Sequence, residues 1–201
     1  LEQEYGVPHE SIHWHSEIDE DIEFVPPSDL KLTRLAHNQT LEDMLVSGEL
    51  DAVIHADLIE PYVNGHPNVG RLFDDYKAEE IAYYQKTGIF PIMHVIAIRR
   101  AVYEKNRWVA QSLYKAFLAA QARAYEALRE TAALRIMLPW TAHHTEETEK
   151  LMGTDFWSYG IDSNEHVLNT FLRYSHEQGL AKRRLTAREI FAPETFESFK
   201  I

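Results

Sequence analysis

Cysteine is absent from the 201-residue chain, so the chain has no disulfide framework and no thiol nucleophile. Long apolar runs are also lacking, since no stretch approaches the roughly 18 to 20 residues that a membrane span requires. The first ten residues, LEQEYGVPHE, contain neither the basic nor the apolar section of a secretory signal. These absences exclude thiol chemistry and predict a soluble protein without a membrane span.

Basic side chains are few, with 20 Lys and Arg against 32 Asp and Glu and a net charge of −12. Such a charge repels a phosphate backbone, so we expect no nucleic-acid partner. The GxSxG, Walker and dinucleotide-binding fingerprints are missing as well, which leaves serine hydrolase, nucleoside triphosphatase and Rossmann oxidoreductase activities without support.

The apolar content, 45% of the residues, is sufficient for the core of one domain or two small lobes. The chain opens on a pattern typical of the last turns of a helix, which Gly6 ends before Pro8. We therefore expect the natural N-terminus to lie upstream of Leu1.

The first half alternates predicted strands with predicted helices. In SIHWHS, residues 11–16, Ile12 and Trp14 share one face and His13 and His15 share the other, the period-two pattern of a half-buried strand. An acidic stretch, SEIDEDIEFVPP, follows, and its two prolines favour an extended connection.

A strand, a helix and a second strand are then expected in the order that favours a parallel sheet with a right-handed crossover. Thr40 begins and Gly48 ends a short amphipathic helix, and DAVIHA, residues 51–56, comes directly after it as a buried strand. Ligands collect at the carboxyl ends of such strands, which is where His55 and Asp57 occur.

The second half is predicted to be almost entirely helical after one central strand. Residues 89–100, IFPIMHVIAIRR, are apolar on both faces of a strand, as in a fully covered sheet, and only His94 interrupts them. Helices are expected over YKAEEIAYYQKT, from Trp108 through the longest amphipathic stretch, and over TEETEKLMG, SNEHVLNTFLRYSHEQG and TAREIF. In the last two, Ser163 and Thr186 are the expected N-caps.

Seven segments carry a resemblance that covers nearly the whole chain: EYGVPHESIHW, LEDMLVSGELDAVI, HPNVGRLFDDY, TGIFPIMHVIAIRR, WVAQSLYKAF, LPWTAHHTEETEKLMGTDFWSYGI and FLRYSHEQGLAKRRLTAREIFAPET. In order and spacing they resemble the 4,5-dihydroxyphthalate decarboxylase family. TGIFPIMH and DFWSYG are the most specific of these motifs.

The resemblance implies an α/β fold of the type II periplasmic-binding-protein kind, in which two α/β lobes close on a ligand. On this interpretation residues 1–94 form the second α/β lobe with its central sheet, and the strand around His94 crosses the hinge. Residues 95–201 form the hinge crossing and the helix-rich C-terminal part of the first lobe. The N-terminal strands of that lobe would then be missing from this chain.

The family's chemistry is non-oxidative loss of a carboxylate from a hydroxylated aromatic ring, which requires a proton donor at the ring carbon. We expect His94 to supply or shuttle this proton and His55 or Asp57 to polarise a ring hydroxyl. Arg99 is a candidate for binding the substrate carboxylates, because a guanidinium matches their geometry. Phe90 and His15 are the remaining candidates for substrate binding, and the Phe90 ring could form the floor of a site for an aromatic ligand.

Each candidate has a structural alternative. His94 could be a hydrogen-bonded core histidine, and His55 and Asp57 could belong to a solvated loop. Arg99 and Arg100 could simply be two neighbouring arginines on the protein surface.

Two histidine groups resemble metal sites, but we expect neither metal nor cofactor. His13 and His15 form an H-x-H pair that could bind a transition metal with a carboxylate from EIDED, but nothing in the sequence fixes the other ligands. His143 stands near Glu146 and Glu147, and glutamates at a helix N-terminus are expected simply to complement the dipole.

Two functions remain open. One is a cytoplasmic carboxy-lyase of bacterial aromatic-compound degradation, and the other is a non-catalytic, periplasmic solute-binding protein of the ABC-transporter type for a small aromatic or other carboxylate. Fold alone does not separate them. In both cases the partner is a small aromatic carboxylate ligand, and a homo-oligomer is possible.

Overall fold

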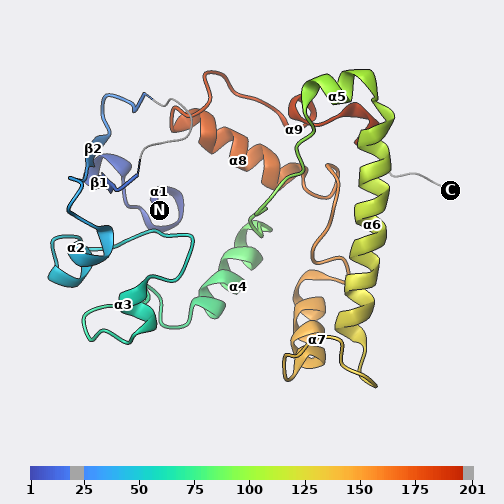
Figure 1. The fold of residues 1–201 in the computed structure, drawn as a ribbon, viewed down its shortest axis with the longest axis horizontal. Coiled ribbons are helices and arrows are strands. Elements are labelled where there is room, and N and C mark those ends of the chain that lie inside the picture. The colour runs from blue at the N-terminus through green and yellow to red at the C-terminus, as the bar shows by residue number, and fades with distance from the viewer. Residues whose placement is uncertain (19–24, 197–201) are drawn as a thin grey trace. The chain divides into compact units, whose positions relative to one another are not determined.

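Residues 1–18 and 25–196 are described by a computed structural model (Figure 1). The chain divides into two compact units, the first comprising Leu1–Gly88 with Gln178–Leu180 and the second Ile89–Glu177 with Ala181–Ile201. The described residues form a mixed α/β structure, mostly helical, with one small two-stranded sheet. The coarse α/β prediction is thereby confirmed.

The sheet lies in the first unit and pairs β1 (His13–Ser16) with β2 (Lys31–Arg34) in parallel. His13 stands opposite Lys31, and His15 stands opposite Thr33. The strand predicted around residues 11–16 is therefore confirmed. Its partner was not foreseen, because the sequence KLTR lacks a clear alternation of apolar and polar residues.

The helices of the first unit include one with the expected capping residues, Thr40 and Gly48, and one, over residues 60–63, that was not foreseen. The helices of this unit are α1 (Glu2–Tyr5), the 3₁₀ turn η1 (His9–Ser11), α2 (Leu41–Ser47), α3 (Glu60–Val63) and α4 (Tyr76–Thr87). The Thr40 side chain accepts a hydrogen bond from the Asp43 amide, as an N-cap does. Gly48 and Gly88 end α2 and α4 in the left-handed conformation, which glycine adopts without steric cost.

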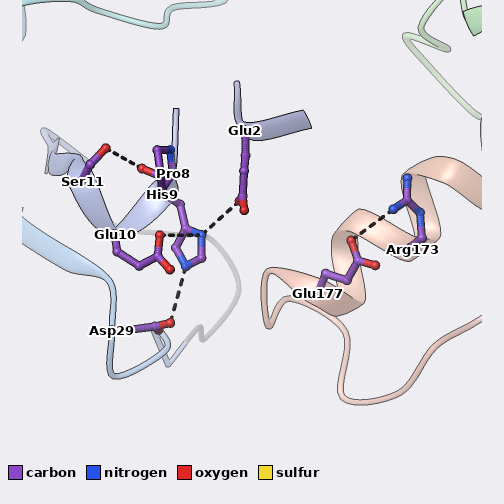
Figure 2. Close-up of polar contacts among 8 residues, drawn as sticks. All are labelled: Glu2, Pro8, His9, Glu10, Ser11, Asp29, Arg173 and Glu177. Atoms are coloured by element: carbon purple, nitrogen blue, oxygen red, sulfur yellow. Dashed lines mark hydrogen bonds and ion pairs between the residues drawn. The ribbon is translucent and has the colours of Figure 1, made fainter. Parts of the chain in front are cut away.

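A cluster of side chains ties α1, η1 and the segment before β2 together. Figure 2 shows the His9 imidazole among Glu2, Glu10 and Asp29. Its Nδ1 lies 3.4 Å from Glu2 and 3.7 Å from Glu10, and its Nε2 lies 3.5 Å from Asp29. Hydrogen bonds to the Glu2 and Asp29 carboxylates raise the pKa of His9 above its ordinary value.

The regular secondary structure of the second unit is entirely helical over its described residues. It contains α5 (Arg100–Lys105), α6 (Trp108–Arg129), α7 (Thr141–Met152), α8 (Glu165–Glu177), α9 (Ala187–Ile190) and the 3₁₀ turn η2 (Pro193–Thr195). Its small core contains Ile161, Leu168 and Ala187, against which Phe191 and Phe196 pack. This core joins α8 to α9 and the segment after it.

Polar contacts fix the ends of the longest helix, α6. At its C-terminal end the Arg129 Nε donates to the Glu149 carboxylate of α7 over 2.7 Å. Before its N-terminal end, the Arg107 Nε lies 2.7 Å from Glu194 of η2, which also accepts a hydrogen bond from the Tyr103 hydroxyl. In the part of the chain that the structure describes, neither α6 nor any other helix is long and apolar enough to cross a membrane.

Two predicted strands are wrong. Residues 51–56 and 89–99 form neither helix nor strand. Both segments have strand-like composition, but a strand exists only where a partner satisfies its main-chain groups. The acidic connection predicted over SEIDEDIEFVPP falls partly on residues 19–24, which lie outside the described residues.

Of the two N-caps predicted for the last two helices, the structure confirms one and contradicts the other. Thr186 caps α9 in a reciprocal capping box with Glu189, as expected. Ser163 does not immediately precede α8, which begins at Glu165, and the residue before that helix is Asn164. The Asn164 amide group instead donates to the carbonyl oxygens of Ser158 and Gly160, which fixes the turn leading into the helix.

Candidate functional site

The six residues predicted for the site divide between the two units. His15, His55 and Asp57 belong to the first unit, and Phe90, His94 and Arg99 belong to the second.

His55 and Asp57 lie together in an exposed turn before α3. The His55 Nδ1 is 3.0 Å from the Asp57 carbonyl oxygen and 3.1 Å from the Asp57 amide nitrogen. Nδ1 donates to the carbonyl if it carries the ring proton, and otherwise it accepts from the amide. In either case the contact runs through the main chain of Asp57 and leaves its carboxylate available to a ligand.

His15 and His13 lie on the same face of β1, with ring centroids 4.5 Å apart. The His13 Nε2 is 2.8 Å from the Thr33 hydroxyl of β2, so His13 is fixed in place by the neighbouring strand. The His15 Nδ1 is shielded from solvent and has no hydrogen-bond partner among the described residues. His15 thus retains an unused polar atom on the histidine face of β1.

His94 lies in the segment 89–99 and is exposed. In the described structure His94 is therefore not buried, because the strand that would have buried it is not formed. Phe90, four residues earlier, meets Trp157 edge-on at a ring-centroid distance of 5.6 Å.

Arg99 precedes the first turn of α5 and is exposed. Its carbonyl oxygen accepts hydrogen bonds from the Val102 and Tyr103 amides. Within the described residues its guanidinium forms no ion pair, whereas the neighbouring Arg100 lies 3.8 Å from Glu104. The side chain of Arg99 is thus on the surface, without a protein group that aims it.

A hollow of about 300 Å³ lies between α2 and α3 in the first unit. Its lining includes the carboxylates of Glu42, Asp43 and Glu60, and His66. Three carboxylates disfavour an anionic ligand, since like charges repel at short range. This hollow is therefore unsuited to an aromatic dicarboxylate.

The histidines of α7 interact with a glutamate of their own helix. His143 and His144 each approach the Glu147 carboxylate at 3.6 Å. Over residues 1–18 and 25–196 no group of three or more His, Cys, Asp and Glu side chains is arranged to hold a metal ion. Part of the EIDED stretch, which was considered as a third ligand beside His13 and His15, falls outside this range.

Arg71 is the positioned cation that sequence reasoning missed. Its Nε donates to the Tyr62 hydroxyl over 3.0 Å. Its guanidinium carbon lies 4.4 Å from the centroid of the Tyr76 ring and 5.1 Å from that of Tyr62. The available signal was the motif HPNVGRLFDDY, in which a single arginine occurs in a loop between two tyrosine-bearing helices.

Comparison with known proteins identifies relatives of this chain. No model of a known protein family matches the chain. The 4,5-dihydroxyphthalate decarboxylase of Comamonas testosteroni is 36% identical over 207 aligned residues, which include all of this chain and 63% of the relative. The 4,5-dihydroxyphthalate decarboxylase of Pseudomonas putida is 31% identical over 91 residues, which amount to 42% of this chain and 35% of the relative.

Identity of this extent along the whole chain makes the chain a homologue of the Comamonas protein of that name. The resemblance to the 4,5-dihydroxyphthalate decarboxylase family, which the motifs predicted, is thereby confirmed. The chain spans 63% of the length of the Comamonas relative.

Proposed function

We propose that the protein to which this chain belongs is a non-oxidative decarboxylase of a hydroxylated aromatic dicarboxylate, with 4,5-dihydroxyphthalate as the first substrate to test. The observation that carries this proposal is the 36% identity to a decarboxylase of that name over the whole chain. The reaction replaces one ring carboxylate by a proton and releases carbon dioxide, so it balances without an oxidant or reductant.

Direct loss of carbon dioxide from an aryl carboxylate would leave a ring carbanion. A proton must therefore reach the ring carbon before or during cleavage of the carbon–carbon bond. His94 is our candidate for this acid, and its exposure leaves the imidazole accessible to a ligand. His55 or Asp57 would accept a hydrogen bond from the ring hydroxyl para to the departing group and so increase the basicity of that carbon.

We also propose the type II periplasmic-binding-protein fold for the whole protein, with lobes divided near His94. The family resemblance supports this proposal, and so does the parallel pairing of β1 with β2. In such a fold, ligand contacts come from both lobes, and closure excludes water from the reacting group.

The decisive experiment is to incubate the full-length protein with 4,5-dihydroxyphthalate and to follow protocatechuate by chromatography and carbon dioxide by trapping. We expect one molecule of each product per substrate consumed. Substrate that is bound tightly but recovered unchanged would overturn the decarboxylase proposal and favour a solute-binding protein.

A further inference from the structure

Arg71 is held in place by two aromatic side chains rather than by a carboxylate. Tyr62 lies in α3 and Tyr76 is the first residue of α4, so the ends of two helices fix the positions of both rings. Contact with the ring faces stabilises the guanidinium through its positive charge, and the Tyr62 hydroxyl holds Nε. These contacts restrict the side chain before any ligand arrives.

This arrangement differs from that of other arginines in an acidic protein. Arg107, Arg129 and Arg183 each lie within 2.7 Å of a glutamate oxygen. For Arg71, no carboxylate of the described residues is in ion-pair contact, although Asp74 and Asp75 follow closely in the sequence. The Asp75 carboxylate instead accepts a hydrogen bond from the Ala78 amide at the start of α4.

The terminal nitrogens of the Arg71 guanidinium are suited to binding a carboxylate. Its Nε is engaged by Tyr62, and within the described part of the chain its two terminal nitrogens have no hydrogen-bond partner. A guanidinium presents parallel N–H donors in a fork that a carboxylate accepts in a bidentate manner. Restriction by the two tyrosines lowers the ordering cost of binding such a group.

We propose that Arg71 binds the carboxylate that remains on the aromatic ring of the substrate. This inference rests on the proposed decarboxylase function and names a binding residue for it. A cation on the departing carboxylate would stabilise the charged ground state more than the transition state leading to neutral carbon dioxide, and so would slow the reaction. A cation on the retained carboxylate binds substrate, transition state and product alike.

The test uses phthalate, an unreactive dicarboxylate without ring hydroxyls, and measures its dissociation constant for the full-length protein by calorimetry. Arg71→Met removes the charge and should weaken phthalate binding by about 10- to 100-fold, as loss of a charge-assisted hydrogen-bonded pair does. Arg71→Lys keeps the charge but loses the forked pair of N–H donors, so its affinity for phthalate should lie between that of Arg71→Met and that of the wild type. Arg123→Met is the matched control, because Arg123 is an exposed arginine of α6 and the change removes the same charge.

Kinetics separate a binding role from a general structural one. With 4,5-dihydroxyphthalate as substrate, Arg71→Met should raise KM by about the same factor by which it raises the dissociation constant of phthalate. It should change kcat by less than about threefold, because an interaction that is equally strong in the ground state and the transition state affects KM and not kcat. Protocatechuate, which keeps one carboxylate, should inhibit the variant more weakly than the wild type.

Equal phthalate affinity of wild type and folded Arg71→Met would overturn the inference, whatever the activity. If Arg71→Met does not fold, Tyr62→Phe provides the second test, because it retains the ring and removes the hydroxyl that holds Nε. Its phthalate affinity should fall by a smaller factor, and unchanged affinity would also count against the inference. A wild-type protein that binds phthalate through Arg71 but leaves 4,5-dihydroxyphthalate intact would reject the proposed function and retain the anion site.

Discussion

Each contact of His9 favours its protonated form. The imidazole lies near the carboxylates of Glu2, Glu10 and Asp29, which come from α1, η1 and the segment before β2. Because these contacts raise the pKa of His9 above its ordinary value of 6.5, protonation and folding of this region are linked.

We predict that the contribution of His9 to stability depends on pH. A raised pKa in the folded state means that this contribution is fully present below about pH 6.5 and is lost as the pH rises through the higher folded pKa. The difference in unfolding free energy between wild type and His9→Gln should therefore shrink from pH 6 to pH 8.5, as measured by urea denaturation.

His37→Gln is the matched control for this experiment, since His37 is another exposed histidine of the first unit. Its effect should not vary between the two pH values. A His9 effect that grows with pH would show that the imidazole is not held by these carboxylates in solution.

A second prediction at this scale concerns His94. His94→Asn keeps a planar polar side chain but loses the titratable proton, so catalysis by a general acid should fall by about 100-fold or more. Because the side chain is exposed, the unfolding free energy should change by less than about 0.5 kcal/mol. Activity assays and urea denaturation on the same preparation measure both effects.

A His94→Asn variant that unfolds readily, while its folded fraction reacts normally, would reassign His94 to a structural role. His37→Asn offers a comparison from another exposed histidine, outside the candidate residues. That change should leave both activity and stability close to those of the wild type.

At the scale of elements, the sequence predicted helices well because their signals are local. Thr40, Gly48, Gly88 and Thr186 mark helix ends by caps that involve only a few neighbouring residues. Strands depend on distant partners, so residues 51–56 and 89–99 were assigned from composition and are not strands, while β2 was missed. The pairing of Arg71 with Tyr62 and Tyr76 was also invisible, because it depends on the path of the chain between α3 and α4.

The candidate site shows the same division between local and distant information. The sequence placed His13 and His15 on one strand face, which follows from the period of two, and the structure has them there. It also placed His55 near Asp57, which two residues of separation almost ensures. Whether these residues and His94 serve one reaction stays a prediction, because it depends on contacts between distant parts of the chain.

We predict that α8 contributes to stability through one face only. Leu168 is 8% exposed and belongs to the core cluster, whereas Phe171 on the same helix is 64% exposed. Leu168→Ala should lower the unfolding free energy by about 2–5 kcal/mol through lost burial and a residual cavity. Phe171→Ala should change it by less than about 0.5 kcal/mol, and urea denaturation compares the two.

An equal cost for Phe171→Ala would contradict this assignment. It would mean that the Phe171 ring is covered in solution by another segment or chain. The two variants thus compare how much the buried face and the exposed face of α8 contribute to the unfolding free energy.

At the scale of the whole molecule, large apolar side chains remain exposed on several elements. On α6 these include Trp108, Leu113 and Phe117, and in the segment 89–99 they include Val95 and Ile96. Exposed apolar faces of this kind favour association with another surface.

We therefore predict that the 201-residue chain by itself associates and is inactive. Light scattering should give a mass above that of the 23.4 kDa monomer, and no protocatechuate should form from 4,5-dihydroxyphthalate. The full-length protein is the control and should be active in the same buffer. A stable, active monomer of 201 residues would contradict the two-lobe interpretation.

The exposure of residues 89–99 also has a consequence for oxidation chemistry. Since the chain has no cysteine, methionine is its sulfur-containing residue, and Met93, beside His94, is 60% exposed whereas Met44 is 8% exposed. Peroxide should convert Met93 to its sulfoxide well before Met44, and this change places a polar oxygen next to the candidate acid. Mass spectrometry of the two methionines therefore reports, residue by residue, whether this segment becomes shielded in the full-length protein.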